Sequence, residues 1–216
     1  MYKTIIFDLD GTLLDSLTDI YTSVNVALSA YGLPNRTKEE VRAFVGNGIV
    51  KLMERAVGIV GYPQMDGVMS VVEKHYGEHC KDETKPYDGV MEALQKMAAA
   101  GIKTAVVSNK PDFAVKLLAE EYFQGLLLDA VGENESVGIR KKPAPDSLLA
   151  VMQTLGAKAE ETLYVGDSEV DIQTAKNAGV ACLSVTWGFR SKEFLIESGA
   201  TLLADTPFEM LQYCGL

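Results

Sequence analysis

Apolar residues occur along the chain in two patterns, short continuous runs and helical stripes. The run at residues 3–8, KTIIFD, is β-branched and aromatic and too short for a helix, which predicts a strand buried on both faces. Similar runs predict strands at 102–108, 126–131, 162–166, 181–185 and 201–204, and helical patterns at 88–100, 145–156 and 168–178 lie between them. Strands that alternate with helices predict an α/β fold with a parallel, Rossmann-like sheet covered on both faces.

Residues 16–82 carry helical stripes and no strand pattern. Ser16 with Asp19, and Thr37 with Glu40, have the spacing of capping boxes at the start of two of these helices. We therefore expect an α/β core formed by residues 1–15 and 83–216, with an all-helical segment, residues 16–82, inserted after the first strand.

Composition narrows the class of protein. The chain has 216 residues, 47% of them hydrophobic and 23% charged, which is typical of a globular protein. Its formal net charge of -10 disfavours a nucleic-acid partner, and an anionic ligand would need cations within the site. Cys80, Cys182 and Cys214 have no disulfide or zinc spacing. With no membrane-length apolar stretch and no targeting segment, we expect a cytoplasmic protein without a membrane partner, either a monomer or a weak homodimer.

Polar residues follow several predicted strands. They are Asp8 and Asp10 after the first strand, Ser108 after IKTAVV, Lys142 in RKKPAP, and Asp167 after TLYVG with Asp171 four residues later. Ligands bind beyond the carboxyl ends of parallel strands, so these side chains are expected to meet there. Four clustered carboxylates would raise one another's pKa unless a cation lies among them, and Mg²⁺ favours such oxygen ligands.

The chemistry of these groups is that of phosphoryl transfer. One aspartate can attack phosphorus to form an aspartyl-phosphate, and a second can protonate the leaving oxygen and then activate water. The Ser108 hydroxyl and Lys142 can stabilise phosphate charge, and Gly11 allows the turn after the pair. Taken singly, each aspartate or serine could instead cap a helix or turn, and the lysine could be solvated. Their convergence at one rim of the sheet favours a site.

At these residues the sequence resembles the haloacid dehalogenase superfamily, and more closely its phosphoglycolate phosphatase-like branch. The resemblance covers nearly the whole chain through four ordered motifs, DLDGTLLDS, VVSNKP, KKPAPDSLL and YVGDSEVDIQTAKNAG. It implies a Mg²⁺-dependent phosphatase that acts on a small phosphorylated metabolite, with 2-phosphoglycolate as the best single candidate. The helical segment resembles the family's cap. The segment 131–143, VGENESVGIRKKP, departs from the acidic glycine-rich stretch that often precedes the third motif.

The resemblance also implies roles for individual residues. Asp8 would be the nucleophile and Asp10 the general acid and base. Mg²⁺ would be held by the Asp8 side chain, the Asp10 backbone carbonyl and Asp167, with Asp171 steadying the arrangement. Ser108 and Lys142 would stabilise charge. The expected phosphate- or substrate-binding residues are Gly11, Thr12 and Asn109, with Asn47, Lys51 and Arg55 of the cap as leaving-group contacts.

Other functions remain open at this point. A β-phosphoglucomutase-like mutase shares the second aspartate and the helical cap. A receiver-like signalling module shares the acidic cluster, the hydroxyl and a Lys-Pro pair, but its usual single domain has no insertion. His75 and His79 have helical spacing that could chelate a metal, although an exposed helix face is the simpler interpretation, and Trp187 is expected to pack rather than to stack on a substrate.

Overall fold

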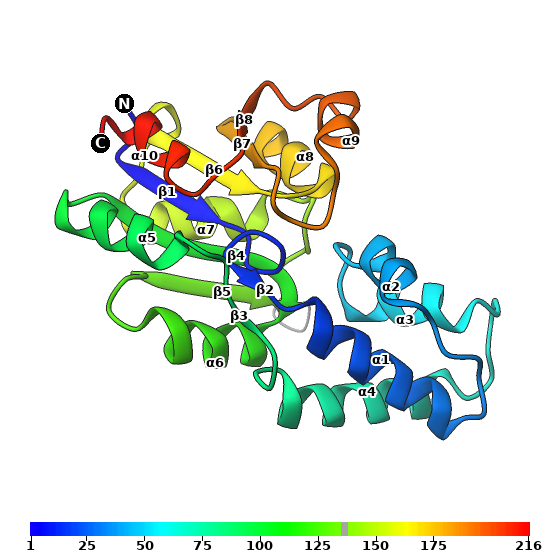
Figure 1. Cartoon of the computed structure of the whole chain (residues 1–216). Helices are drawn as coiled ribbons and strands as arrows, with labels where there is room; N and C mark the ends of the chain where they lie inside the picture. Colours follow the sequence, from blue (N-terminus) through cyan, green and yellow to red (C-terminus); the bar gives the residue numbers. More distant parts are fainter. Residues whose placement is uncertain (135–137) are drawn as a thin grey trace.

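The central feature of the fold is a sheet of six parallel strands, in the order β5-β4-β1-β6-β7-β8 (Figure 1). The structure is a computed structural model that describes residues 1–134 and 138–216. The strands are β1 (Thr4–Phe7), β4 (Lys103–Pro111), β5 (Asp129–Glu133), β6 (Thr162–Gly166), β7 (Ala181–Val185) and β8 (Leu202–Ala204). The predicted parallel α/β sheet is confirmed.

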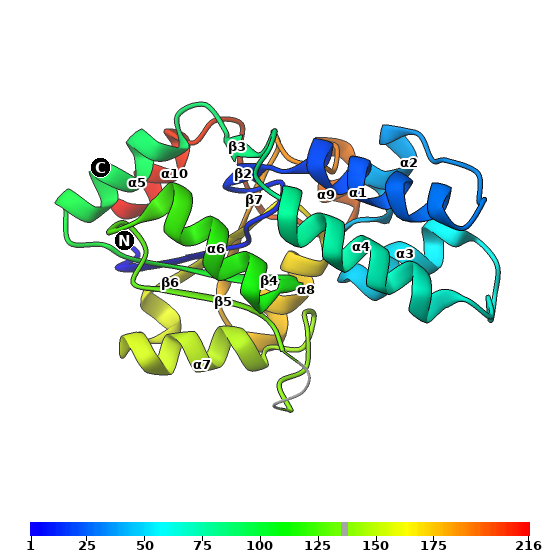
Figure 2. The ribbon, with the colours of Figure 1, turned by 90° about the horizontal axis from the view of Figure 1, so that it is seen from below.

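Helices cover both faces of this sheet (Figure 2). Ile5 and Phe7 of β1 point into an apolar cluster with α5 (Val90–Ala99), α6 (Asp112–Phe123) and α10 (Glu209–Cys214). Ile6 points to the other face, where α7 (Asp146–Leu155) and α8 (Glu169–Ala178) form a second cluster. This alternation explains why β1 is apolar at every position. The 3₁₀ helix η2 (Ala159–Glu161) precedes β6, and α9 (Lys192–Glu197) precedes β8.

Two strand boundaries differ from the prediction. The apolar run predicted as a strand at 126–131 contributes its first residues to the turn after α6, and the strand itself is Asp129–Glu133. Leu126 and Leu127 are apolar because they pack on the core, which made them resemble strand residues. Strand β4 extends past residue 108 to Pro111, with an irregular register after Val107.

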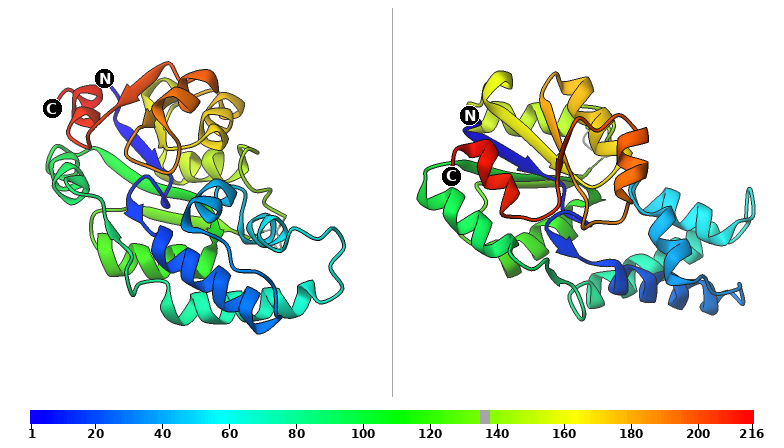
Figure 3. Two further views of the ribbon diagram at one scale, coloured as in Figure 1. Left: turned by 45° about the vertical axis from the view of Figure 1, so that its right-hand side comes forward. Right: turned by 45° about the horizontal axis from the view of Figure 1, so that its top comes forward.

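Four helices lie between the short strands β2 (Leu14–Asp15) and β3 (Lys85–Pro86), which pair antiparallel where the chain leaves the sheet and returns. These helices, called here the helical insertion, are α1 (Leu17–Ala30), α2 (Lys38–Phe44), α3 (Ile49–Val57) and α4 (Met65–His79). They stand beside the end of the sheet toward which the β1 arrow points (Figures 1 and 3). One apolar cluster continues from the sheet into the insertion, so the two parts share a core.

Only one of the two predicted capping boxes forms. Thr37 and Glu40 make the reciprocal bonds that start α2. Asp19 instead lies buried and accepts hydrogen bonds from the backbone amides of Glu83 and Thr84 and from the Thr84 hydroxyl. The predicted box at Ser16 is therefore wrong, because Asp19 accepts from donors on the segment that leads from the insertion into β3. This contact ties the first helix of the insertion to its exit.

Candidate active site

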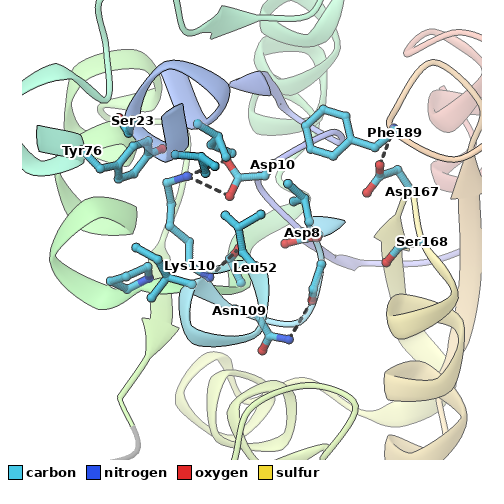
Figure 4. A pocket seen from close by; sticks show the side chains of 18 of the residues that line it. Asp8, Asp10, Ser23, Leu52, Tyr76, Asn109, Lys110, Asp167, Ser168 and Phe189 are labelled. Carbon is cyan, nitrogen blue, oxygen red and sulfur yellow. Dashed lines mark hydrogen bonds and ion pairs between the residues drawn. The ribbon is translucent and has the colours of Figure 1, made fainter. Parts of the chain in front are cut away.

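The candidate site lies where β1 meets its two neighbours, β4 and β6, at the carboxyl end of the sheet. The chain runs to β4 and β5 on one side of β1 and to β6, β7 and β8 on the other, which makes β1 the point where the strand order reverses. A pocket at this point is lined by residues of both the sheet and the helical insertion (Figure 4). The lining includes five of the predicted polar residues, namely Asp8, Asp10, Ser108, Asn109 and Asp167.

Three aspartates form a buried acid cluster. One carboxylate oxygen from each of Asp8, Asp167 and Asp171 lies within 4.8 Å of the other two. Burial, followed by the charges of Asp171 and Asp8, holds the pKa of Asp167 well above its usual range. Burial also raises the pKa of Asp8 to about 6, although the Lys142 charge opposes the shift. These carboxylates destabilise one another, so a cation among them would be strongly favoured.

Lys142 already pairs with part of this cluster. Its Nζ lies 2.9 Å from Asp8 Oδ1 and 2.8 Å from Asp171 Oδ1, and it donates to the Tyr164 hydroxyl at 2.9 Å. Burial lowers the pKa of Lys142, but the charges of Asp171 and Asp8 outweigh it, so its pKa is raised and the ammonium stays charged. Lys141, the neighbouring lysine, pairs with Glu133. Lys142 is therefore the lysine beside Asp8. Residues 135–137 of the divergent segment lie outside the described part of the chain.

Asp171 is engaged on both carboxylate oxygens. Oδ1 accepts from Lys142 and Tyr164, and Oδ2 accepts from the backbone amide and the hydroxyl of Ser168 at 3.1 and 2.6 Å. These bonds fix Lys142 and the first turn of α8. Its implied role, steadying the site rather than forming its main metal contact, agrees with this arrangement and stays a prediction.

Asp167 is packed against glycines. Its Oδ2 accepts a hydrogen bond of 2.6 Å from the backbone amide of Phe189. A Cβ at Gly11, where φ is +82°, would come within 2.3 Å of Asp167 Oδ2, and a Cβ at Gly188 would lie 2.4 Å from the Gly11 carbonyl oxygen. Glycine at both positions lets two loops close around the carboxylate.

Gly188→Ala is expected to lower the free energy of unfolding by about 1–3 kcal/mol, because the backbone oxygen of Gly11 cannot move aside without shifting its loop. Denaturant unfolding measures this change. Gly77→Ala is the matched control: its Cβ would meet only Phe113 at 3.8 Å, and helix propensity favours alanine. Equal stability of the two variants would contradict the packing described for Asp167.

Asp10 points away from the acid cluster. Its carboxylate oxygens lie 2.7 and 2.8 Å from Lys110 Nζ, and Oδ1 also accepts the Ser16 hydroxyl at 2.5 Å. The Lys110 ammonium lies 4.7 Å from the centroid of the Tyr76 ring, which belongs to α4. The second aspartate is thus held between the sheet and the insertion (Figure 4).

The predicted phosphate contacts have different surroundings. Ser108 lines the pocket, where its hydroxyl oxygen accepts from the Lys110 amide at 3.4 Å. Asn109 also lines it, but its side-chain amide donates to the carbonyls of Gly46 and Lys142, and its Oδ1 accepts from the Lys142 amide. Asn109 thereby connects the backbone of Lys142 to Gly46 of the insertion.

Gly11 and Thr12 are absent from the pocket lining. Gly11 forms the turn after β1, where its amide donates to the Leu14 carbonyl. Thr12 is fully buried, and its carbonyl accepts from Trp187 Nε1 at 3.0 Å. Their predicted contact with substrate or phosphate stays a prediction.

The structure does not bring the three predicted leaving-group residues into the pocket lining. Arg55 donates to the Phe44 carbonyl and to Asn47 Oδ1, both at 2.7 Å. Lys51, with about half of its side chain exposed, pairs with Glu54. Between residues 45 and 56, the pocket is instead lined by Val45, Gly46, Gly48, Ile49 and Leu52. Substrate contact by Asn47, Lys51 and Arg55 remains a prediction that this geometry does not support.

Two basic residues that the sequence did not single out line the pocket, Lys110 and Arg190. Lys110 follows Ser108 and Asn109 directly, so its motif could have indicated it, but a buried lysine cannot be told from a solvated one by spacing. Arg190 comes directly after residues 186–189, which include Trp187, and it donates to the carbonyls of Arg42 and Val45 in the insertion. Arg42 in turn donates to the carbonyls of Gly188 and Phe189. These reciprocal bonds dock the insertion on the sheet.

Several known proteins are similar to this chain in sequence and in structure. Residues 5–185 match the family described as haloacid dehalogenase-like hydrolase. The chain belongs to this family. A phosphoglycolate phosphatase of Vibrio parahaemolyticus is 34% identical over 97% of this chain and 95% of its own length. One of Pseudomonas syringae pv. syringae is 33% identical over 98% of this chain and 79% of its own length. A crystal structure from Lactobacillus delbrueckii subsp. bulgaricus is 35% identical, with a TM-score of 0.93 and 98% coverage of both chains.

The family resemblance and the hydrolase class expected from the motifs are thereby confirmed. Within the described ranges, the acid cluster is the one group of three or more potential metal-binding side chains. His75 and His79, which had the spacing of a metal-chelating pair, have other partners. His75 Nδ1 is hydrogen-bonded to the Ser23 hydroxyl and His79 Nδ1 to the Asp82 carboxylate. None of the described helices has both the length and the apolar character needed to cross a membrane.

Proposed function

We propose that this chain is a Mg²⁺-dependent phosphatase that hydrolyses a small phosphomonoester through an aspartyl-phosphate on Asp8, with 2-phosphoglycolate as its substrate. The observation that carries the proposal is the position of Asp8. Its carboxylate is buried at the end of β1, in contact with Lys142, among further carboxylates, and at the floor of a pocket roofed by the helical insertion. Two relatives that match almost the whole chain are named phosphoglycolate phosphatases.

Asp8 is suited to attack phosphorus. The Leu9 amide at 2.7 Å and the Lys142 ammonium at 2.9 Å both contact Oδ1, which fixes the orientation of the carboxylate. With a pKa of about 6, the group is ionised at neutral pH even without a metal. Attack would form a covalent intermediate, and Lys142 would stabilise the negative charge that gathers around Asp8 and the phosphoryl group.

The acid cluster fits a hard divalent cation. Its donors are carboxylate oxygens, and among the described residues no lysine pairs with Asp167 as Lys142 does with Asp8 and Asp171. Asp8 and Asp167 would hold Mg²⁺, and Asp171 would steady them. When bound, the ion would neutralise the cluster and polarise a phosphoryl oxygen.

Asp10 would supply the proton for the leaving oxygen and later activate water. It lies two residues after Asp8, and its carboxylate accepts a hydrogen bond from Ser16 at the start of the insertion, on the side of the pocket where the leaving group of a bound ester would lie. The helical insertion would act as a cap, because Val45, Gly46, Gly48, Ile49 and Leu52 form one wall of the pocket. The Arg42 and Arg190 bonds hold this part of the insertion against residues 188–190 of the core.

A panel of phosphate esters tests this proposal and separates it from a sugar phosphate mutase. With Mg²⁺, purified protein is expected to release inorganic phosphate from 2-phosphoglycolate with a kcat/KM at least about tenfold above that for glucose 1-phosphate. Isomerisation of the sugar phosphate without phosphate release would contradict the proposal. A stable phosphoprotein with negligible turnover would favour the receiver-like alternative, although the four-helix insertion gives that alternative no support.

A further inference from the structure

Few positive charges are available to a substrate in this pocket. Among the described residues of its lining, the basic side chains are Lys110 and Arg190. Arg190 already donates to Glu169 and to the carbonyls of Arg42 and Val45, so its guanidinium is committed to docking the insertion. Lys142 is committed to Asp8 and Asp171. Lys110 is therefore the basic side chain of this lining that could still bind a ligand.

Lys110 lies between Asp10, the proposed proton donor, and Tyr76 of the insertion. Only 3% of its side chain is exposed, and its ammonium contacts both oxygens of Asp10. Two of its three N–H donors suffice for those contacts, which leaves one for a ligand. The Tyr76 ring face supports the same charge from the side of α4.

The wall opposite Asp10 is largely apolar. Helices α1, α3 and α4 contribute five apolar residues to the pocket lining, namely Ile20, Val24, Ile49, Leu52 and Val72. A charged group on a substrate would lose its hydration against these side chains, with no compensating hydrogen bond. Lys110 offers an anion a partner at this wall, whereas a cationic group would meet an ammonium.

We infer that Lys110 is a specificity-determining residue that binds a carboxylate on the short leaving group of the substrate. The inference rests on the proposed function and adds the residue and the charge class to it. Asp10 must touch the leaving oxygen to protonate it, and Lys110 touches Asp10. A carboxylate one carbon away from that oxygen therefore falls next to Nζ. This assignment replaces Lys51 and Arg55, which do not line the pocket.

The test compares esters whose leaving groups share a two-carbon skeleton and differ in charge. In the wild-type protein with Mg²⁺, kcat/KM is expected to fall from 2-phosphoglycolate to ethyl phosphate and further to 2-aminoethyl phosphate. In Lys110→Met, the ratio of kcat/KM for 2-phosphoglycolate to that for ethyl phosphate is expected to drop about 10- to 100-fold, the effect of losing one charge-assisted hydrogen bond. Disturbance of Asp10 affects both esters, so it cancels in the ratio.

Lys110→Arg keeps the charge and is expected to retain most of the ratio. Lys116→Met is the matched control, because Lys116 is an exposed lysine on α6 that pairs with Asp112. An unchanged ratio in Lys110→Met, or a collapse in Lys51→Met instead, would overturn the inference while the phosphatase proposal stands. Should Lys110→Met fail to fold, a wild-type preference for the cationic ester would overturn it equally. Hydrolysis of none of the esters would overturn both.

Discussion

Asp8→Asn is expected to lower kcat by at least about 1,000-fold, because an amide cannot form the acyl-phosphate that the proposed mechanism requires. Phosphate release from 2-phosphoglycolate under saturating Mg²⁺ measures the loss. The fold should survive the change, since asparagine has nearly the same shape and Lys142 keeps its contact with Asp171. Circular dichroism and thermal unfolding check that the variant remains folded.

Asp66→Asn is the matched control for this substitution. Asp66 is an exposed aspartate in the first turn of α4, so the same chemical change there should leave kcat within about twofold. If Asp8→Asn retained more than a few per cent of the wild-type kcat, Asp8 would not be the nucleophile.

Mg²⁺ is expected to stabilise the protein through Asp167. At a concentration about 100 times its Kd, the ion should add about 2.7 kcal/mol to the free energy of unfolding, or roughly 5–10 °C in Tm for a chain of this size. Asp167→Asn should need at least tenfold more Mg²⁺ than the wild type for the same rise in Tm. EDTA should stop turnover of the wild-type protein reversibly. Thermal unfolding at several Mg²⁺ concentrations measures the shift independently of activity.

Without metal, Asp167→Asn should raise the free energy of unfolding instead of lowering it. The pKa values of Asp8 and Asp167 are raised, so the folded state binds these protons more tightly than the unfolded state does. Stability therefore falls as pH rises from the unfolded value near 3.8 through the folded pKa, which is about 6 for Asp8. In EDTA at pH 8, Asp167→Asn should be more stable than the wild type, and the difference should shrink on acidification. A wild-type protein that is the more stable of the two in EDTA at pH 8 would contradict the destabilising cluster.

The fold and the centre of the site follow from the sequence because they rest on short-range patterns. The all-apolar run of β1 requires cover on both faces, and parallel strands bring their carboxyl ends to one rim, which places Asp8 near Ser108 and Asp167. Strand ends were predicted less well where apolar residues serve the core without pairing, as Leu126 and Leu127 do.

The cap side of the site could not be predicted in the same way. Whether a lysine is solvated or buried depends on contacts between distant segments, and Lys110 meets Asp10 across 100 positions of sequence. The spacing of Lys51 and Arg55 fits a helix face, but it does not say which face looks into the pocket. Ser16 and Asp19 have the spacing of a capping box, but each side chain has a distant partner instead. The Ser16 hydroxyl donates to Asp10, and Asp19 accepts from the amides of Glu83 and Thr84.

The most direct measurement is chemical trapping of the intermediate during turnover of 2-phosphoglycolate. Borohydride reduces an aspartyl-phosphate to homoserine, and mass spectrometry of the tryptic peptide spanning residues 4–36 locates the converted residue. We predict homoserine at position 8 when ester and Mg²⁺ are present, and none in Asp8→Asn. Turnover at the wild-type rate with residue 8 still aspartate, or with another aspartate converted, would contradict covalent catalysis by Asp8.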